Sequence, residues 1–256
     1  MKNLNWIEEK ENLGKEILLD LYKNGMIKTW YRDNPKGWIL KSGIWSPFYI
    51  QLRSLPSYPK LLKKVGYALG KLIREEVNHI NKVMGIAMAG IPIAIAISLS
   101  NEISACYSRK LVADVPLSDF DEYIKRYGEH SIIEGGLKDG DLIGLIDDLV
   151  TRFDSKIEAI NQLKIEVKIQ NLKSIKYSDV IVLLDREQGA FDVAKKHNIK
   201  LHCLIPFKTK GELWLKEILS EKEFEIIFDY LKDAEKYQNQ KIRSILKRIA
   251  NEKAKN

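Results

Sequence analysis

Two adjacent carboxylates, Asp147 and Asp148, follow an apolar run that is typical of a buried strand, and Thr151 follows them just before a predicted helix. Many nucleotide-handling α/β folds build a phosphate site in this order, because the free N–H groups at a helix N-terminus attract an anion. Neighbouring carboxylates repel each other unless a cation, a metal ion or a sugar diol uses them. The pattern therefore predicts a site for a ribose and a phosphate, with Mg²⁺ nearby. The alternative is a helix-capping acid beside an exposed neighbour.

The turn before this helix is unusual, because it reads Arg152-Phe153-Asp154 where such turns normally carry glycine and small hydroxyl residues. Phenylalanine lacks the freedom of glycine to adopt a positive φ. A carboxylate about 4 Å from a phosphate charge costs on the order of 4 kcal/mol at an effective dielectric constant of about 20. Arg152 or Lys156 offsets this cost if either turns inward, and Asp154 avoids it by turning away to cap the helix. The phosphate half of the site is therefore rewritten, and these alternatives remain open.

Three other segments carry residues suited to an anionic ligand. The glycine-containing loop 85–92 lets the backbone approach a ligand closely, although a tight strand-to-helix turn also needs glycine. Arg109 and Lys110 end a predicted strand, and further cations follow at 125–130, which suits a polyphosphate or is ordinary surface charge. Asp185 and Arg186 leave another apolar strand together, as a salt bridge or as a recognition fork.

The elements that must position these residues alternate along the chain. Apolar strand patterns near 82–90, 104–110, 130–136, 142–150, 179–185 and 200–207 are separated by helical patterns near 91–103, 155–167 and 190–198. This order predicts an α/β fold with a mainly parallel sheet covered by helices, and ligands bind such sheets beyond the carboxyl ends of the strands. A helix near 6–25 and two short strands around Ser42-Gly43 precede it, and the chain from 210 onward is expected to be helical.

Length and composition exclude several classes of protein. The 256 residues suit one large domain with extensions, no apolar run is long enough for a membrane span, and the two cysteines form no disulfide framework. The net charge is +7, and residues 232–256 carry eight basic and three acidic side chains, a net of +5. This basic tail is read as a solvated helix, so nucleic acid is not an expected partner. We expect a cytoplasmic protein.

Five motifs together resemble the orotate phosphoribosyltransferases, in particular the type that forms the N-terminal part of UMP synthase. The motifs are LKSGIWSPFYIQLRSLPSYPKLL, GIAMAGIPIA, YSRK with the later KRYGEHSIIEGGLKDGD, IDDLVT, and VIVLLDREQGA. The resemblance covers roughly residues 12–208. It implies the type I phosphoribosyltransferase fold over 1–209, with a small N-terminal hood at about 1–58, and leaves 210–256 as a helical, basic C-terminal extension.

The resemblance also implies a reaction. Family members transfer the phosphoribosyl group of 5-phosphoribosyl-1-pyrophosphate (PRPP) to orotate, using Mg²⁺ that is held mainly by PRPP and water, in the biosynthesis of UMP. Departure of pyrophosphate leaves a cation-like ribosyl centre, so catalysis requires stabilising a polyanion and excluding water. A homodimer is implied, because the loop that carries the catalytic lysine reaches the site of the other subunit.

The resemblance assigns a role to each motif residue. The residues that hold and stack the base are Lys41, Phe48, Tyr49 and Arg186. The residues that line or neutralise the pyrophosphate are Ala87, Met88, Arg109, Lys110 and the catalytic Lys125. The residues that hold the ribose hydroxyls are Asp147 and Asp148, and those that bind the 5′-phosphate are Thr151 and Ser155.

Two departures from the family pattern keep other functions open. One is the Arg152-Phe153-Asp154 turn, and the other is an acidic insertion of fourteen residues, 111–124, before Lys125. The first function is orotate phosphoribosyl transfer. The alternatives are transfer to another base or from another donor, and a non-catalytic protein that binds the ligand for regulation.

Overall fold

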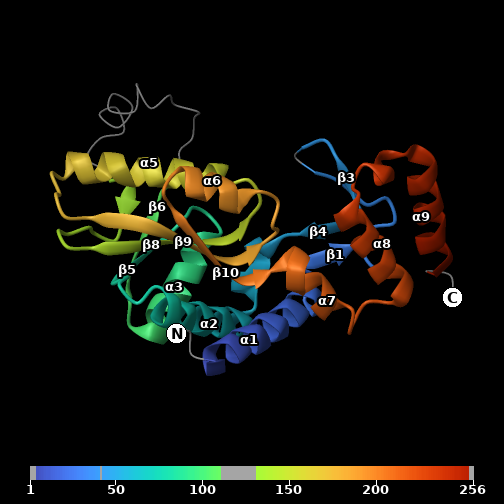
Figure 1. Cartoon of the computed structure of the whole chain (residues 1–256), viewed down its shortest axis with the longest axis horizontal. Coiled ribbons are helices and arrows are strands. Elements are labelled where there is room, and N and C mark those ends of the chain that lie inside the picture. Colours follow the sequence, from blue (N-terminus) through green and yellow to red (C-terminus); the bar gives the residue numbers. More distant parts are fainter. Residues whose placement is uncertain (1–3, 41, 111–130, 254–256) are drawn as a thin grey trace.

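A six-stranded sheet forms the centre of the molecule in the computed structural model, which describes residues 4–40, 42–110 and 131–253 (Figure 1). The strand order is β10-β9-β8-β5-β6-β7, and all neighbours are parallel except the edge pair β6–β7. The strands are β5 (Lys82–Gly85), β6 (Ser104–Ser108), β7 (Ile133–Glu134), β8 (Leu142–Val150), β9 (Lys176–Asp185) and β10 (Lys200–Pro206). The predicted mainly parallel α/β sheet is therefore confirmed.

Helices cover both faces of the sheet, as Figure 1 shows. The helices on one face are α1 (Leu4–Lys23), α2 (Pro59–Glu76) and α3 (Gly90–Asn101), and those on the other are α5 (Asp154–Ile169) and α6 (Ala190–Lys196). Alternate residues of β9 explain this arrangement. Ile181 and Leu183 belong to the core shared with α1, α2 and α3, whereas Val180 and Val182 belong to the core shared with α5 and α6. Successive side chains of a strand point to opposite faces, so an unbroken apolar strand needs cover on both sides.

Two small two-stranded sheets stand beyond the carboxyl ends of the parallel strands. Strand β1 (Ile27–Thr29) pairs antiparallel with β4 (Phe48–Ile50), and β2 (Trp38–Ile39) pairs with β3 (Trp45–Ser46). The short 3₁₀ helix η1 (Leu52–Ser57) then leads into α2, in which Pro59 is the first residue. These elements form the N-terminal hood.

The C-terminal extension is helical and packs against the hood, on the right of Figure 1. Its elements are the π-helical turn η3 (Phe207–Gly211), α7 (Glu212–Leu215), α8 (Glu221–Lys232), the 3₁₀ turn η4 (Lys236–Gln238) and α9 (Gln240–Lys253). The Tyr237 ring stacks on Trp45 with centroids 6.4 Å apart, and Gln238 Oε1 accepts a hydrogen bond of 2.9 Å from Trp45 N. The buried Glu223 carboxylate accepts hydrogen bonds from Tyr22 and Thr29. Hood and extension therefore share one core, and a boundary at 209/210 stays a prediction.

The helices in the described ranges include none with the length and apolarity that crossing a membrane requires.

Candidate active site

The predicted ligand-binding loops meet at one edge of the sheet because β5, β6, β8 and β9 run parallel. Gly85 pairs with Tyr107 on one side and with Ile146 on the other, and Val150 pairs with Asp185. The ends of these four strands therefore bring together the loop after β5, the cations after β6, the acidic pair in β8 and the Asp185-Arg186 step. Lys41, Lys125 and the insertion 111–124 lie outside the described residues.

The acidic pair is buried and already has a cation. Lys156, whose side chain is 4% exposed, places Nζ 2.7 Å from Asp147 Oδ2. The same ammonium donates to the carbonyl oxygen of Leu149 at 2.6 Å. Of the possibilities that the sequence left open, Lys156 is thus the side chain that turns inward, whereas Arg152 is exposed.

Asp148 differs from Asp147 in its charge environment. Burial raises the pKa of the Asp148 carboxyl to about 7, and the neighbouring Asp147 charge contributes in the same direction. The backbone N–H of Leu149 donates to Asp148 Oδ1 at 2.7 Å, which opposes the rise. One carboxylate of the pair is therefore held in an ion pair, while the other changes its protonation near neutral pH.

The rewritten turn keeps the backbone shape of a glycine turn. Phe153 has φ +81° and ψ −3°, so the expectation that phenylalanine prevents a positive φ is wrong. Its ring is 1% exposed and belongs to the core beneath α5, and this apolar burial offsets the backbone cost of roughly 1–2 kcal/mol.

The prediction that Asp154 caps the following helix is also wrong. Phe153 is the N-cap residue and no side chain accepts a capping hydrogen bond, whereas Asp154 is the first residue of α5 and is exposed. Ser155 is exposed too, and its Oγ accepts a hydrogen bond of 3.3 Å from Lys156 Nζ. Thr151 is half-buried at the end of β8.

The loop after β5 is held close to β8. A β-carbon at Gly90 would collide with the carbonyl oxygen of Ile146, so this approach requires glycine. Ala87 N donates to Ser108 Oγ at 3.1 Å, and the Ala87–Met88 peptide bond is cis. The Met88 side chain is 63% exposed and is free to contact a ligand.

The cations after β6 differ in their partners. Arg109 Nε lies 2.9 Å from Glu134 Oε1 on the neighbouring strand β7, and this ion pair is partly exposed. Lys110 is exposed. A polyanion that reaches this edge would therefore compete with Glu134 for Arg109.

Arg186 is the least satisfied polar group at this edge. It directly follows β9, its backbone N–H donates to the Val150 carbonyl at 3.1 Å, and its Nε is buried without a hydrogen-bond partner in the described structure. Burial lowers the pKa of its guanidinium. A buried guanidinium that lacks an anion is unfavourable, and a bound carboxylate removes that penalty.

The two aromatic residues predicted to hold the base have different surroundings. The Phe48 ring is 1% exposed and packs against Phe207 and, edge-on, against Tyr230, with the Arg186 guanidinium 5.4 Å from its centroid. The Tyr49 ring is 36% exposed and stacks on Trp38 with centroids 6.0 Å apart. Phe48 therefore supports Arg186 from below, and of the two rings Tyr49 is the one accessible to a ligand.

Sequence reasoning missed the contribution of the C-terminal extension to this region. Tyr230, on α8, contacts the Phe48 ring, which in turn lies beside the Arg186 guanidinium. No motif joins residues so far apart in sequence. The only available signal was the aromatic residue on the apolar face of a predicted helix.

No family model matches the chain, but individual proteins do. It is 31% identical over 175 residues to the orotate phosphoribosyltransferase of Methanocaldococcus jannaschii, a match that covers 68% of this chain and 85% of that protein. It is 30% identical over 171 residues to the uridine 5′-monophosphate synthase of Bos taurus, covering 67% of this chain but 32% of that longer protein. The chain thus spans about a third of the UMP synthase.

Solved structures show the same relationship. UMP synthase from Leishmania donovani superimposes with a TM-score of 0.67 at 25% identity, covering 86% of this chain and 42% of that one. Orotate phosphoribosyltransferase from Aeropyrum pernix superimposes with a TM-score of 0.59 at 21% identity, covering 79% and 97%, and supports the fold.

Proposed function

The chain belongs to the orotate phosphoribosyltransferase family, and from that premise we propose that it transfers the phosphoribosyl group of PRPP to orotate in pyrimidine biosynthesis. The products are orotidine 5′-monophosphate and pyrophosphate. The observation that carries the proposal is the buried, unpartnered Nε of Arg186, one strand away from the acidic pair Asp147-Asp148. A cation that lacks an anion beside a pair of ribose-binding carboxylates suits an anionic base acceptor.

On the base side, Arg186 binds the carboxylate or carbonyl of orotate as a fork, and Tyr49 covers the ring. Phe48, Phe207 and Tyr230 hold the guanidinium in place from the protein side. Lys41, which precedes Ser42 in the turn between β2 and β3, adds a second positive charge. A preorganised cation of this kind fixes the base where its nitrogen meets the ribose carbon.

On the ribose side, Asp147 and Asp148 accept hydrogen bonds from the two ribose hydroxyls. Lys156 neutralises Asp147, so the pair brings about one negative charge instead of two to the site. That arrangement permits a highly anionic donor to approach with less repulsion. Thr151, Ser155 and the free N–H groups at the start of α5 bind the 5′-phosphate, while Asp154 stays in solvent.

On the leaving-group side, the Ala87-Met88 loop lines the pyrophosphate, and Arg109, Lys110 and Lys125 neutralise it. Mg²⁺ supplies further neutralisation of the pyrophosphate oxygens when it is bound. The described residues contain no group of three or more His, Cys, Asp or Glu side chains that could hold a metal ion. In this proposal the ion is carried mainly by PRPP and water, with Asp148 as a nearby carboxylate.

The functional unit is proposed to be a cytoplasmic homodimer. Ile95 and Leu99, one turn apart on α3, are 40% and 82% exposed, and Tyr67 on α2 is 43% exposed. Exposed apolar side chains on adjoining helices favour contact with another protein surface.

The test is consumption of orotate by the purified protein with PRPP and Mg²⁺, followed by the loss of orotate absorbance. Arg186→Gln and Lys125→Ala are the control variants. Each removes one cation that is proposed to bind a ligand, and the two residues belong to different segments of the chain. Turnover that both substitutions abolish supports the proposal. Absence of turnover in a folded protein that still binds orotate would favour another donor or a regulatory role.

A further inference from the structure

A cavity of about 410 Å³ lies at the opposite end of the sheet from the candidate active site. It is bounded by α5, by the start of β9 and by the turn that follows α6. Lys164 lies eight residues after Lys156 on α5, about 12 Å along the helix. Ser178 lies seven residues before Asp185 on β9, about 23 Å along the strand. The cavity is therefore distinct from the site described above.

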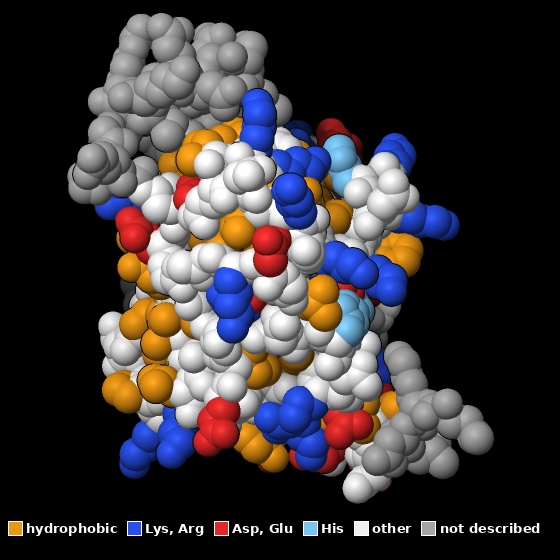
Figure 2. All heavy atoms as spheres, turned by 90° about the vertical axis from the view of Figure 1, so that its left-hand side faces the viewer, with side chains coloured by type: hydrophobic (Ala, Val, Ile, Leu, Met, Phe, Trp, Pro, Cys, Tyr) orange, Lys and Arg blue, Asp and Glu red, His pale blue; other side chains and the backbone are white. Residues whose placement is uncertain are grey.

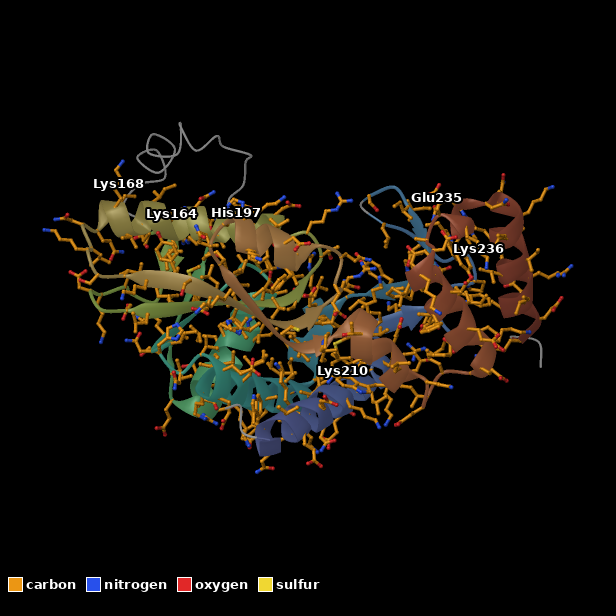
Figure 3. The ribbon with its side chains drawn as sticks, viewed as in Figure 1. Lys164, Lys168, His197, Lys210, Glu235 and Lys236 are labelled. Atoms are coloured by element: carbon orange, nitrogen blue, oxygen red, sulfur yellow. The ribbon has the colours of Figure 1, made fainter. Side chains whose placement is uncertain are left out.

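Two lysines and a histidine line this cavity, and their side chains lack partners in the described part of the chain. Lys164 comes from α5, Lys176 from the first position of β9, and His197 from the C-terminus of α6, and none makes a side-chain hydrogen bond or ion pair. Figure 3 shows Lys164 and His197 on neighbouring helices. Figure 2 faces this end of the sheet and shows Lys and Arg side chains spread over it, with acidic side chains among them.

The lining contains no carboxylate among the described residues, so its field is positive without internal compensation. Other exposed lysines in the described ranges, such as Lys196 and Lys200, also lack an ion pair, so Lys164 and Lys176 are distinguished by lining one hollow. Unpaired cations converging on one hollow favour an anionic ligand.

The walls of the cavity are apolar and carry a few hydrogen-bonding groups. Four isoleucines form the walls: Ile157, Ile160, Ile175 and Ile199. The Tyr177 ring lies among them, and burial raises the pKa of its hydroxyl. The amides of Asn161 and Asn198 have both donors and acceptors free. Apolar walls with a few convergent polar groups are typical of small-molecule sites, and such sites have volumes of roughly 300–1,000 Å³.

We propose that this cavity is a second ligand site that binds a nucleoside monophosphate, with the phosphate between Lys164, Lys176 and His197 and the base between the isoleucine walls and Tyr177. The positive rim matches the phosphate. The isoleucine walls and the Tyr177 ring match a heterocyclic ring, and the two asparagine amides match its polar edge. Free phosphate would use only the basic rim, and a neutral nucleoside would use only the apolar walls and the amides.

The test is calorimetric titration of the full chain with adenosine 5′-monophosphate, inorganic phosphate and adenosine, with and without saturating PRPP and Mg²⁺. The double variant Lys164→Gln/Lys176→Gln removes two charges from the rim. Lys196→Gln is the matched control, because it removes an exposed lysine on α6 that does not line the cavity. All three side chains are exposed, so the variants are expected to fold, which circular dichroism checks.

The nucleotide is expected to bind at least tenfold more tightly than phosphate or adenosine, and PRPP should not displace it. The double variant should weaken nucleotide binding by about tenfold, whereas Lys196→Gln should leave it unchanged. The His197 ring resonance, assigned with His197→Asn, should move on titration.

Equal losses in both variants would overturn the proposal. Displacement by PRPP would also overturn it, because the nucleotide would then occupy the active site. Binding of inorganic phosphate as tightly as the nucleotide would show that the cavity does not recognise a ring.

Discussion

The two halves of the candidate active site treat charge in opposite ways. On the ribose side, the Asp147 carboxylate is paired with the buried ammonium of Lys156 at 2.7 Å. On the base side, the half-buried Arg186 has a buried Nε without a hydrogen-bond partner in the described structure. Asp147 on the ribose side is therefore paired within the chain, whereas the Arg186 Nε on the base side has no anion until a ligand binds. A buried charge without a partner is a stronger indication of function than one that is already paired.

The largest expected effect comes from the unpaired half. Arg186→Gln should lower kcat/KM for orotate by about a thousandfold, or ~4 kcal/mol, because the buried fork to the base is lost. Steady-state kinetics with varied orotate measures this change. Arg186→Lys keeps the charge but loses the fork and should recover part of the loss. An unchanged kcat/KM in both variants would remove Arg186 from the base site.

The second effect concerns the paired half and appears as stability. Lys156→Met leaves Asp147 buried beside Asp148 without a cation, so the free energy of unfolding should fall by about 3 kcal/mol. Urea denaturation measures it. The double variant Lys156→Met/Asp147→Asn removes the orphaned charge and should regain most of the stability. If the single variant were as stable as the wild type, the Lys156–Asp147 ion pair would not stabilise the ribose side of the site.

A third prediction uses the raised pKa of Asp148. Its carboxyl titrates near 3.8 when unfolded and at about 7 when folded, so the folded state binds more protons between these values. Stability contributed by this group therefore falls as pH rises from about 4 to about 7, with a slope of at most about 1.4 kcal/mol per pH unit. Activity should change in the opposite direction, because ionised Asp148 accepts the ribose hydroxyl.

The control for this pH dependence is Asp148→Asn, which removes the titrating group. The difference in unfolding free energy between wild type and variant should shrink or reverse across that window. A difference that is independent of pH would show that Asp148 titrates normally.

The smallest expected effect tests the turn between the two halves. At Phe153, φ is +81°, so glycine should be preferred over alanine once the ring is removed. Phe153→Ala and Phe153→Gly both lose the buried ring, but the glycine variant should be more stable by about 1 kcal/mol because it avoids the left-handed strain. Thermal unfolding of the two variants compares them directly. A more stable alanine variant would indicate that the turn does not keep this conformation.

The sequence predicted the sheet well, and it predicted the turn poorly. Strands such as β8 and β9 are unbroken apolar runs between polar loops, so their burial on both faces and their parallel order follow from local pattern. Phe153 adopts a glycine-like φ only because its ring is buried in the core beneath α5. Rules based on local sequence do not include this tertiary burial. Tyr230 reaches Phe48 through the packing of α8 on the hood, which local periodicity does not specify.

Lys156 shows where sequence reasoning was nearly sufficient. It was one of two cations expected to turn inward, and it does so in the structure, although its ion pair is with Asp147 and not with Asp154. The sequence could not decide between Arg152 and Lys156, because the outcome depends on which side chain points toward the buried acidic pair.

The measurement that tests the central claim most directly is ³¹P NMR of the protein with PRPP, Mg²⁺ and orotate. If the rewritten turn still binds PRPP and the Arg186 side binds orotate, the PRPP resonances should be replaced by those of pyrophosphate and one phosphomonoester in equal amounts. Unchanged PRPP resonances, in a sample where orotate is shown to be bound, would contradict the assignment of the Asp147-to-Lys156 region as a working donor site.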